Sequence, residues 1–132
     1  MENRANYLKK NQEIEELRKS LKKKIEAAVW LQAIGQISEA FLLSKLYFIS
    51  DNPESEGEKT VLTGAWIQAS GQLLEALGVS KEVSTDNIDI IMEGQRIIIS
   101  GDFLQGVGGL ITSVGGAEVF NEEYFEKPDF LP

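Results

Sequence analysis

Residues 64–71 read GAWIQASG, residues 101–108 read GDFLQGVG and residues 28–35 read AVWLQAIG. In each copy an aromatic residue is followed two places later by glutamine and three places after that by glycine. The copies are offset by 36 and then 37 residues. A repeat of about this length is typical of one supersecondary unit that packs against its own copies.

Glycine recurs at every seventh position through the second and third copies, at Gly57, Gly64, Gly71, Gly78 and at Gly94, Gly101, Gly108, Gly115. Seven residues make two turns of an α-helix, so each series lies on one helical face. A glycine inside a helix costs about 1 kcal/mol relative to alanine. The simplest explanation for so many glycines within helices is that two helix backbones approach each other closely. The first copy has Leu21, Ala28, Gly35 and Leu42 at these places, so its pattern is weaker.

These patterns predict an all-α fold, an antiparallel bundle of three long helices built from a threefold repeat of about 36 residues, with a fourth helix if the first one breaks. We expect one domain over 1–132, since the length suits a single core, and helices near 9–50, 53–79 and 86–116. Asn52 and Pro53 are suited to start the second helix, and Gly78 and Gly115 to end helices. The β-branched stretch 88–99 leaves a hairpin around Gly94 as the alternative.

The repeat also predicts which residues pack between helices. The expected packing positions are Gly35, Gly64, Gly71, Gly101, Gly108, Trp30, Trp66 and Phe103. Gln32, Gln68 and Gln105 recur at one place in the repeat. They either bond to neighbouring groups at the edge of the core or form a polar site for a small ligand. Glu39 and Glu75 occupy matching places as well, and two facing carboxylates would suit a divalent cation.

The composition argues against catalysis. The chain has no cysteine and no histidine, which removes thiolate chemistry, the commonest general base and the usual zinc ligands. We therefore expect no enzymatic activity, no catalytic residues, no cofactor and no metal.

Charge is unevenly distributed along the chain. Residues 1–24 carry eight Lys/Arg and four Glu, a charge of +4, whereas the whole chain carries −8. The acidic body argues against a nucleic-acid partner. The arm at 1–24 is expected to be helical, to project or pair with another element, and to mediate self-association. The tail at 117–132, rich in aromatic and acidic residues, is expected to fold back or dock on a partner.

The phrase Trp-x-Gln-Ala-x-Gly, with glycine and glutamine in register over 28–40, 64–78 and 101–115, resembles an uncharacterised family of small repetitive bacterial Gly/Gln helical proteins. The resemblance implies a helical repeat protein and assigns it no catalytic residues.

From these observations we expect a cytoplasmic, non-enzymatic module for helical interaction or assembly, a homo-oligomer with a further protein partner as an option. A membrane is not the expected partner, because the longest uncharged run, 103–117, is too short to span a bilayer. Two alternatives stay open: a membrane-active protein with glycine-faced helices, and a helical bundle that binds a small ligand or a metal.

Overall fold

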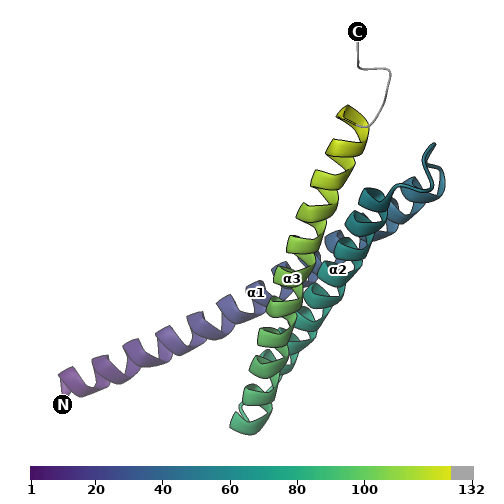
Figure 1. The fold of residues 1–132 in the computed structure, drawn as a ribbon. Coiled ribbons are helices and arrows are strands. Elements are labelled where there is room, and N and C mark those ends of the chain that lie inside the picture. The colour runs from purple at the N-terminus through teal and green to yellow at the C-terminus, as the bar shows by residue number, and fades with distance from the viewer. Residues whose placement is uncertain (126–132) are drawn as a thin grey trace.

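The computed structural model describes residues 1–125 and contains three α-helices. They are α1 (Glu2–Phe48), α2 (Glu56–Val83) and α3 (Ile88–Tyr124). Residues 1–125 contain no strand, so the predicted all-α fold with three long helices is confirmed and the hairpin at 88–99 is wrong. Figure 1 shows α2 and α3 side by side as an antiparallel pair, with α1 running along α2 and extending well beyond it.

The helix ends differ from those expected. Ser55, not Asn52, begins α2: its hydroxyl accepts the backbone N–H of Glu58 at 3.1 Å. Asn87 begins α3 and accepts the N–H of Asp89 at 2.9 Å. Gly78 and Gly115 end no helix, because both lie inside helices and no glycine in residues 1–125 has a positive φ. These two glycines allow the backbones of α2 and α3 to approach each other closely, and neither forms a turn.

The contact between α2 and α3 is made by the glycine series. The series pair in reverse order, Gly57 with Gly115, Gly64 with Gly108, Gly71 with Gly101 and Gly78 with Gly94. A methyl group added to Gly71 would lie 2.6 Å from the carbonyl oxygen of Gly101, and one added to Gly101 would lie 2.5 Å from that of Gly71. The two backbones are therefore in direct contact. Three of the four pairs repeat this two-sided contact, whereas at the end pair a methyl group on Gly115 would lie 3.0 Å from the carbonyl oxygen of Gly57 and one on Gly57 would meet Val119.

The contact between α1 and α2 uses alanine instead. Ala33 and Ala40 of α1 and Ala65, Ala69 and Ala76 of α2 are buried, and they form two small clusters with Val29 and Leu43. α1 and α3 hardly touch each other. The first copy of the repeat thus packs differently from the other two, and the threefold character of the fold stays a prediction.

Large apolar side chains lie mostly outside these contacts. None of the largest side chains in residues 1–125 is fully buried, and the buried apolar residues are alanines and one valine. The helices are joined through their smallest residues and present their largest to the surroundings. A single copy therefore lacks the core that a domain of this length normally has.

Candidate interaction surfaces and a polar cluster

Four of the five predicted packing glycines lie where two helices meet. At Gly64, Gly71, Gly101 and Gly108, an alanine Cβ would lie within 2.8 Å of a carbonyl oxygen of the opposite helix. Gly35 differs, and this part of the prediction is wrong: an alanine Cβ there would have nothing within 4 Å. The reason is that α1 packs on α2 through alanines, which places Gly35 on another face.

The three aromatic residues of the repeat differ in their surroundings. Trp30 is half-buried beside Ala33 and Ala76, and its indole N–H donates to the Ser80 hydroxyl at 2.8 Å. Trp66 is 43% exposed, and its N–H donates to Ser44 at 3.0 Å. The prediction that Phe103 packs between helices is wrong. Its side chain is 70% exposed, because α3 turns its glycine face to α2 and the phenyl ring to the outside.

The glutamines do not form one ring. The side chain of Gln105 donates to Glu75 at 2.7 Å, and that of Gln72 donates to the same carboxylate oxygen at 2.9 Å. Gln72 also donates to Gln32 at 3.5 Å, so this polar cluster joins all three helices. Gln68 lies apart and accepts from the Thr112 hydroxyl at 3.3 Å.

Two members of the cluster, Gln72 and Glu75, lie outside the repeated motif, so the repeat did not identify them. Gln72 is buried, and the spacing of the repeat pairs Glu75 only with Glu39. The amide nitrogens of Gln72 and Gln105 both donate to Glu75, and no buried polar atom of the cluster lacks a partner. The cluster therefore links the three helices through side-chain hydrogen bonds.

The alternative in which Glu39 and Glu75 face each other and hold a cation is not found. Glu39 is exposed, while Glu75 is held by the two glutamines. Residues 1–125 contain no group of three or more acidic side chains placed to hold a metal ion.

An apolar face runs along the side of α3 away from α2. We call it the outer face of α3, and it comprises the exposed side chains of Ile99, Phe103, Leu110 and Val114. Leu110 is 71% exposed. The spacing of four or seven residues places these side chains on one side of the helix. Nothing in residues 1–125 covers this face.

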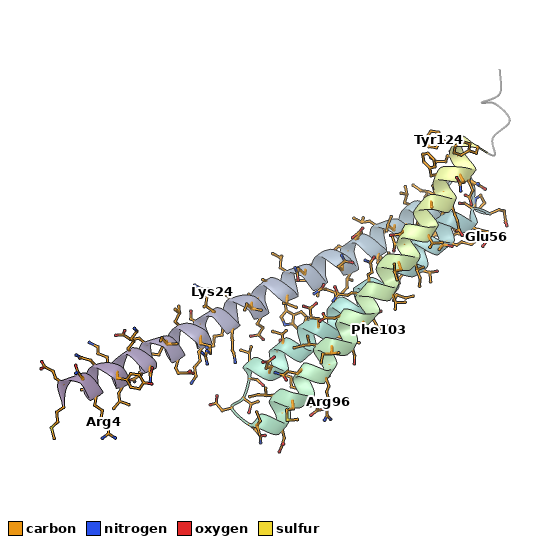
Figure 2. The ribbon with its side chains drawn as sticks, turned by 60° about the vertical axis from the view of Figure 1, so that its left-hand side comes forward. Arg4, Lys24, Glu56, Arg96, Phe103 and Tyr124 are labelled. Atoms are coloured by element: carbon orange, nitrogen blue, oxygen red, sulfur yellow. The ribbon has the colours of Figure 1, made fainter. Side chains whose placement is uncertain are left out.

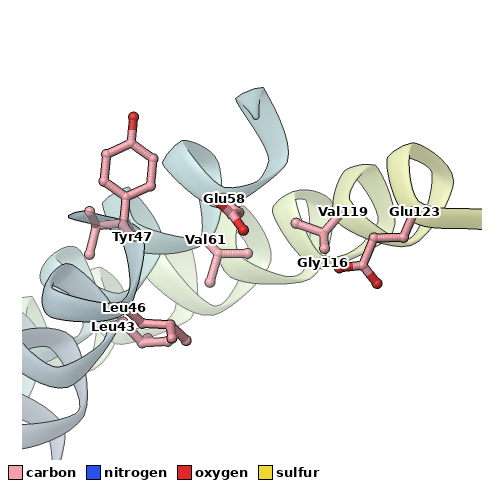
Figure 3. A pocket seen from close by; sticks show the side chains of 9 residues that line it. Leu43, Leu46, Tyr47, Glu58, Val61, Gly116, Val119 and Glu123 are labelled. Atoms are coloured by element: carbon pink, nitrogen blue, oxygen red, sulfur yellow. The ribbon is translucent and has the colours of Figure 1, made fainter. Parts of the chain in front are cut away.

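A second apolar surface is a groove where the C-terminal part of α1 meets the start of α2 and the end of α3 (Figure 3). Its volume is about 330 Å³. We call it the end groove; its lining is Leu43, Leu46, Tyr47, Val61, Leu62, Gly116 and Val119, with Glu58 and Glu123 also contributing. No pattern in the sequence indicates it, because three separate segments build it.

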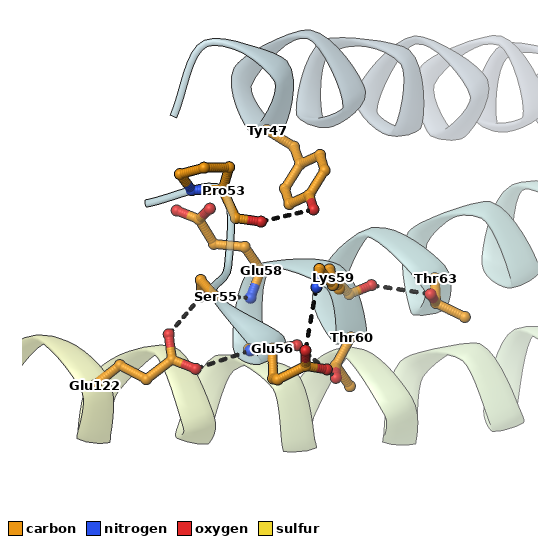
Figure 4. Close-up of polar contacts among 10 residues, drawn as sticks. Tyr47, Pro53, Ser55, Glu56, Glu58, Lys59, Thr60, Thr63 and Glu122 are labelled. Atoms are coloured by element: carbon orange, nitrogen blue, oxygen red, sulfur yellow. Dashed lines mark hydrogen bonds and ion pairs between the residues drawn. The ribbon is translucent and has the colours of Figure 1, made fainter. Parts of the chain in front are cut away.

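Hydrogen bonds hold this end of the molecule together (Figure 4). Glu122 of α3 accepts the backbone N–H of Gly57 at 3.0 Å and the hydroxyl of Ser55. These two bonds, the hydroxyl first, lower the pKa of Glu122 below its usual value, because they stabilise the ionised form. Tyr47 of α1 donates to the carbonyl oxygen of Pro53 at 3.1 Å, which ties α1 to the connecting loop.

The opposite end of α1 is the basic arm, residues 1–24, which projects past the helix pair (Figure 2). Its apolar side chains Tyr7, Ile14, Leu17 and Leu21 are all exposed. The base of the arm runs beside the loop between α2 and α3, where Lys19 and Lys22 lie near Glu82 and Asp86. Within residues 1–125 no ion pair joins the arm to another helix.

Comparison of the chain with protein-family models, with curated proteins and with solved structures found no match. Its function must therefore be inferred from its own surfaces.

Proposed function

We propose that this chain is a non-enzymatic assembly module whose copies associate by covering one another's apolar helix faces. The proposal rests on the distribution of side chains, which is the reverse of that in an ordinary globular domain: small residues lie inside and large apolar residues lie outside. Alanine and glycine fill the contacts within the chain, while leucine, isoleucine and phenylalanine are exposed along the helices. Large exposed apolar surfaces on a folded chain mark sites of interaction.

The surface area supports the same proposal. The chain exposes 9736 Å², whereas a compact monomer of 14.6 kDa would expose about 6,900 Å². The difference is of the order of 2,800 Å² per chain by the same scaling, or about 5,600 Å² for two copies, which is at the upper end of the total area that obligate protein interfaces bury. Association between copies would recover burial that the single chain lacks.

The absence of histidine and cysteine is consistent with a role that involves no chemistry. One carboxylate oxygen of Glu75, Oε2, accepts hydrogen bonds from two glutamines, which gives this acid a structural use. An assembly module needs complementary surfaces only, and the chain offers several.

The test is the molar mass of the purified protein across a concentration series, by light scattering or sedimentation. We expect an oligomer that dissociates on dilution; a monomer at every concentration would refute the proposal.

Replacing Phe103 and Leu110 by aspartate should weaken association by at least about tenfold if the outer face of α3 contributes, because burying an unpaired charge is costly. Aspartate at Gln95 and Ser100 is the matched control, since it adds two charges to the same helix beside that face.

A second candidate function, membrane binding, is favoured by one observation. α3 is the one helix in residues 1–125 that is long and apolar enough to cross a membrane, and only 11% of its most apolar window is buried. Small residues between helices and large ones outside also suit packing in lipid. Against it, Asp102 is exposed in the middle of that stretch, and a carboxylate at the bilayer centre costs about 2.5–3.5 kcal/mol.

Co-sedimentation with vesicles separates the two functions. Protein that binds vesicles and is monomeric in detergent would favour the membrane function. Protein that is oligomeric in water and does not bind vesicles would favour assembly.

A further inference from the structure

We propose that the basic arm of one copy docks in the end groove of a second copy. This inference rests on the proposed assembly and specifies one of its contacts. It commits to a pair of unlike surfaces: a helical arm with an exposed apolar stripe and a net charge of +4, and an apolar groove with acidic residues around it.

The arm has the form of a helix that lies in a groove. Ile14, Leu17 and Leu21 follow the spacing i, i+3 and i+7 and, with Tyr7 one heptad earlier, make an apolar stripe. All four side chains are exposed. Charged residues cover the rest of the arm, and among them the basic ones are Arg4, Lys9, Lys10, Arg18, Lys19, Lys22, Lys23 and Lys24.

The groove complements this helix in shape and charge. Its walls are aliphatic, and about 330 Å³ accommodates apolar side chains. Acidic side chains gather at the same end of the molecule, from the α1–α2 loop, the first turn of α2 and the last turn of α3: Asp51, Glu54, Glu56, Glu58, Glu122 and Glu123. Opposite charges at the edge of an interface steer association and select the partner.

Gly116 adds a steric argument. It lines the groove, and an alanine Cβ at this position would have nothing within 4 Å. A glycine within a helix costs about 1 kcal/mol, and the single copy offers no close contact in return. Gly35 and Gly106 are equally open, so Gly116 leaves room for a docked helix in the groove without by itself requiring one.

An arm that fills the end groove must come from another copy. Leu43, Leu46 and Tyr47, which line the groove, belong to the same continuous helix as the arm. That helix has 47 residues and is about 70 Å long at 1.5 Å per residue. A straight helix cannot bring its first turns to its last turns, and both views show the arm pointing away (Figures 1 and 2). The arm of one chain can therefore reach the groove of its neighbour and not its own.

The experiment uses two full-length variants that damage opposite sides of the contact. The arm variant carries Leu17→Asp and Leu21→Asp, and the groove variant carries Leu46→Lys and Glu123→Lys. All four positions are exposed in the single copy, so both variants should keep the helical circular dichroism of the wild type. A control with Leu31→Lys and Glu39→Lys makes the same two kinds of change elsewhere on α1, at exposed sites outside the groove.

We expect each variant alone to associate at least about tenfold more weakly than the wild type, because each contact would bury an unpaired charge. Mixed in equal amounts, they should form a complex, since the arm variant keeps an intact groove and the groove variant an intact arm. The control should associate as the wild type does. High salt should weaken the wild-type assembly, because it screens charges at the edge of the contact.

Two results would overturn the inference while leaving the proposed assembly in place. One is a groove variant that keeps the wild-type molar mass, which would mean that the arm pairs with another arm or another surface. The other is a mixture of the two weakened variants that forms no complex. A wild-type protein that is monomeric at all concentrations would instead refute the assembly itself, so the two failures are distinguishable.

Discussion

The two helix contacts of this protein use the same principle with different residues. Between α2 and α3 the helices meet through glycine, and the backbones contact each other directly over the length of the pair. Between α1 and α2 they meet through alanine, and the contact covers only the C-terminal half of α1, from Val29 to Leu43. The glycine contact runs along the whole length of α2 and α3, whereas α1 packs on α2 through half of its own length and hardly touches α3. We therefore expect α2 and α3 to form the rigid unit and α1 to be the helix that separates first.

The largest expected effect is at the centre of the glycine contact. Gly71→Ala should lower the free energy of unfolding by about 2–3 kcal/mol, because overpacking outweighs the gain in helix propensity. The added methyl group would lie 2.6 Å from the Gly101 carbonyl oxygen and 2.8 Å from the Gln105 nitrogen, and both belong to the backbone. Chemical denaturation at a fixed protein concentration measures the change. A variant as stable as the wild type would show that α2 and α3 do not touch there.

The next effect tests the alanine contact. Ala76 is fully buried beside Val29 and Ala33, and Ala76→Leu should cost about 1–3 kcal/mol by overpacking. The loss should be local. Hydrogen exchange should show that amides in residues 28–48 lose protection while those of α2 and α3 keep theirs. Equal loss in all three helices would contradict the separation into a rigid pair and a detachable helix.

A smaller effect is expected in the polar cluster that connects the two contacts. Glu75→Gln removes the charge that accepts two amide hydrogen bonds and should cost about 1 kcal/mol. Glu39→Gln is the matched control, because Glu39 is exposed at the corresponding place in the repeat. Thermal unfolding of both variants beside the wild type gives the comparison. Equal effects at the two positions would mean that the cluster contributes nothing specific.

An increase in the free energy of unfolding, rather than a decrease, is expected when glycines that contact nothing within the chain are replaced. An alanine Cβ at Gly35 or Gly106 would have no atom within 4 Å, so alanine at either site should raise stability by about 0.5–1 kcal/mol through helix propensity alone. The measurement is the same denaturation series as for Gly71. Destabilisation instead, together with a smaller molar mass, would show that these glycines lie in a contact between copies.

The smallest expected effect depends on pH and concerns the end of the α2–α3 pair. Since the pKa of Glu122 is lowered in the folded chain, its stabilisation is present above the ordinary carboxyl pKa of about 4.3 and is lost as the pH falls through the lowered value. Glu122→Gln should therefore reduce the melting temperature at pH 7, and the difference from the wild type should shrink steadily as the pH is lowered below about 4.3. A difference that stays constant down to acidic pH would assign the effect to packing rather than to charge.

Much of the fold could be predicted from residues and spacing. The seven-residue glycine series predicts two long helices with facing backbones, and it outweighs the β-branched stretch 88–99, which by itself suggests strands. The ends of the helices are less predictable. Glycine near the end of a pattern suggests a stop, but Gly78 is used for its contact with Gly94, and the helix continues beyond it.

The candidate surfaces are only partly predictable. Gln32 and Gln105 occupy equivalent positions of the repeat and belong to one polar cluster. The other two members, Gln72 and Glu75, lie outside the repeated motif. Aromatic residues at helical spacing usually lie inside, and Phe103 lies outside. The expectation for the tail concerns residues 117–132; α3 extends through Tyr124, and residues 126–132 lie outside the described part of the chain.

The sequence by itself determined the helices, the face on which α2 and α3 meet, and the charge contrast between arm and body. These follow from periodicity and composition, which act within a helix or over the whole chain. Only the tertiary structure decided that α1 packs through alanine, that the largest apolar residues remain uncovered, and that an apolar groove forms among acids at the end opposite the arm. Those features depend on which faces of different helices meet. Where no glycine series marks a contact, the periodicity of a helix does not specify which of its faces a neighbour covers.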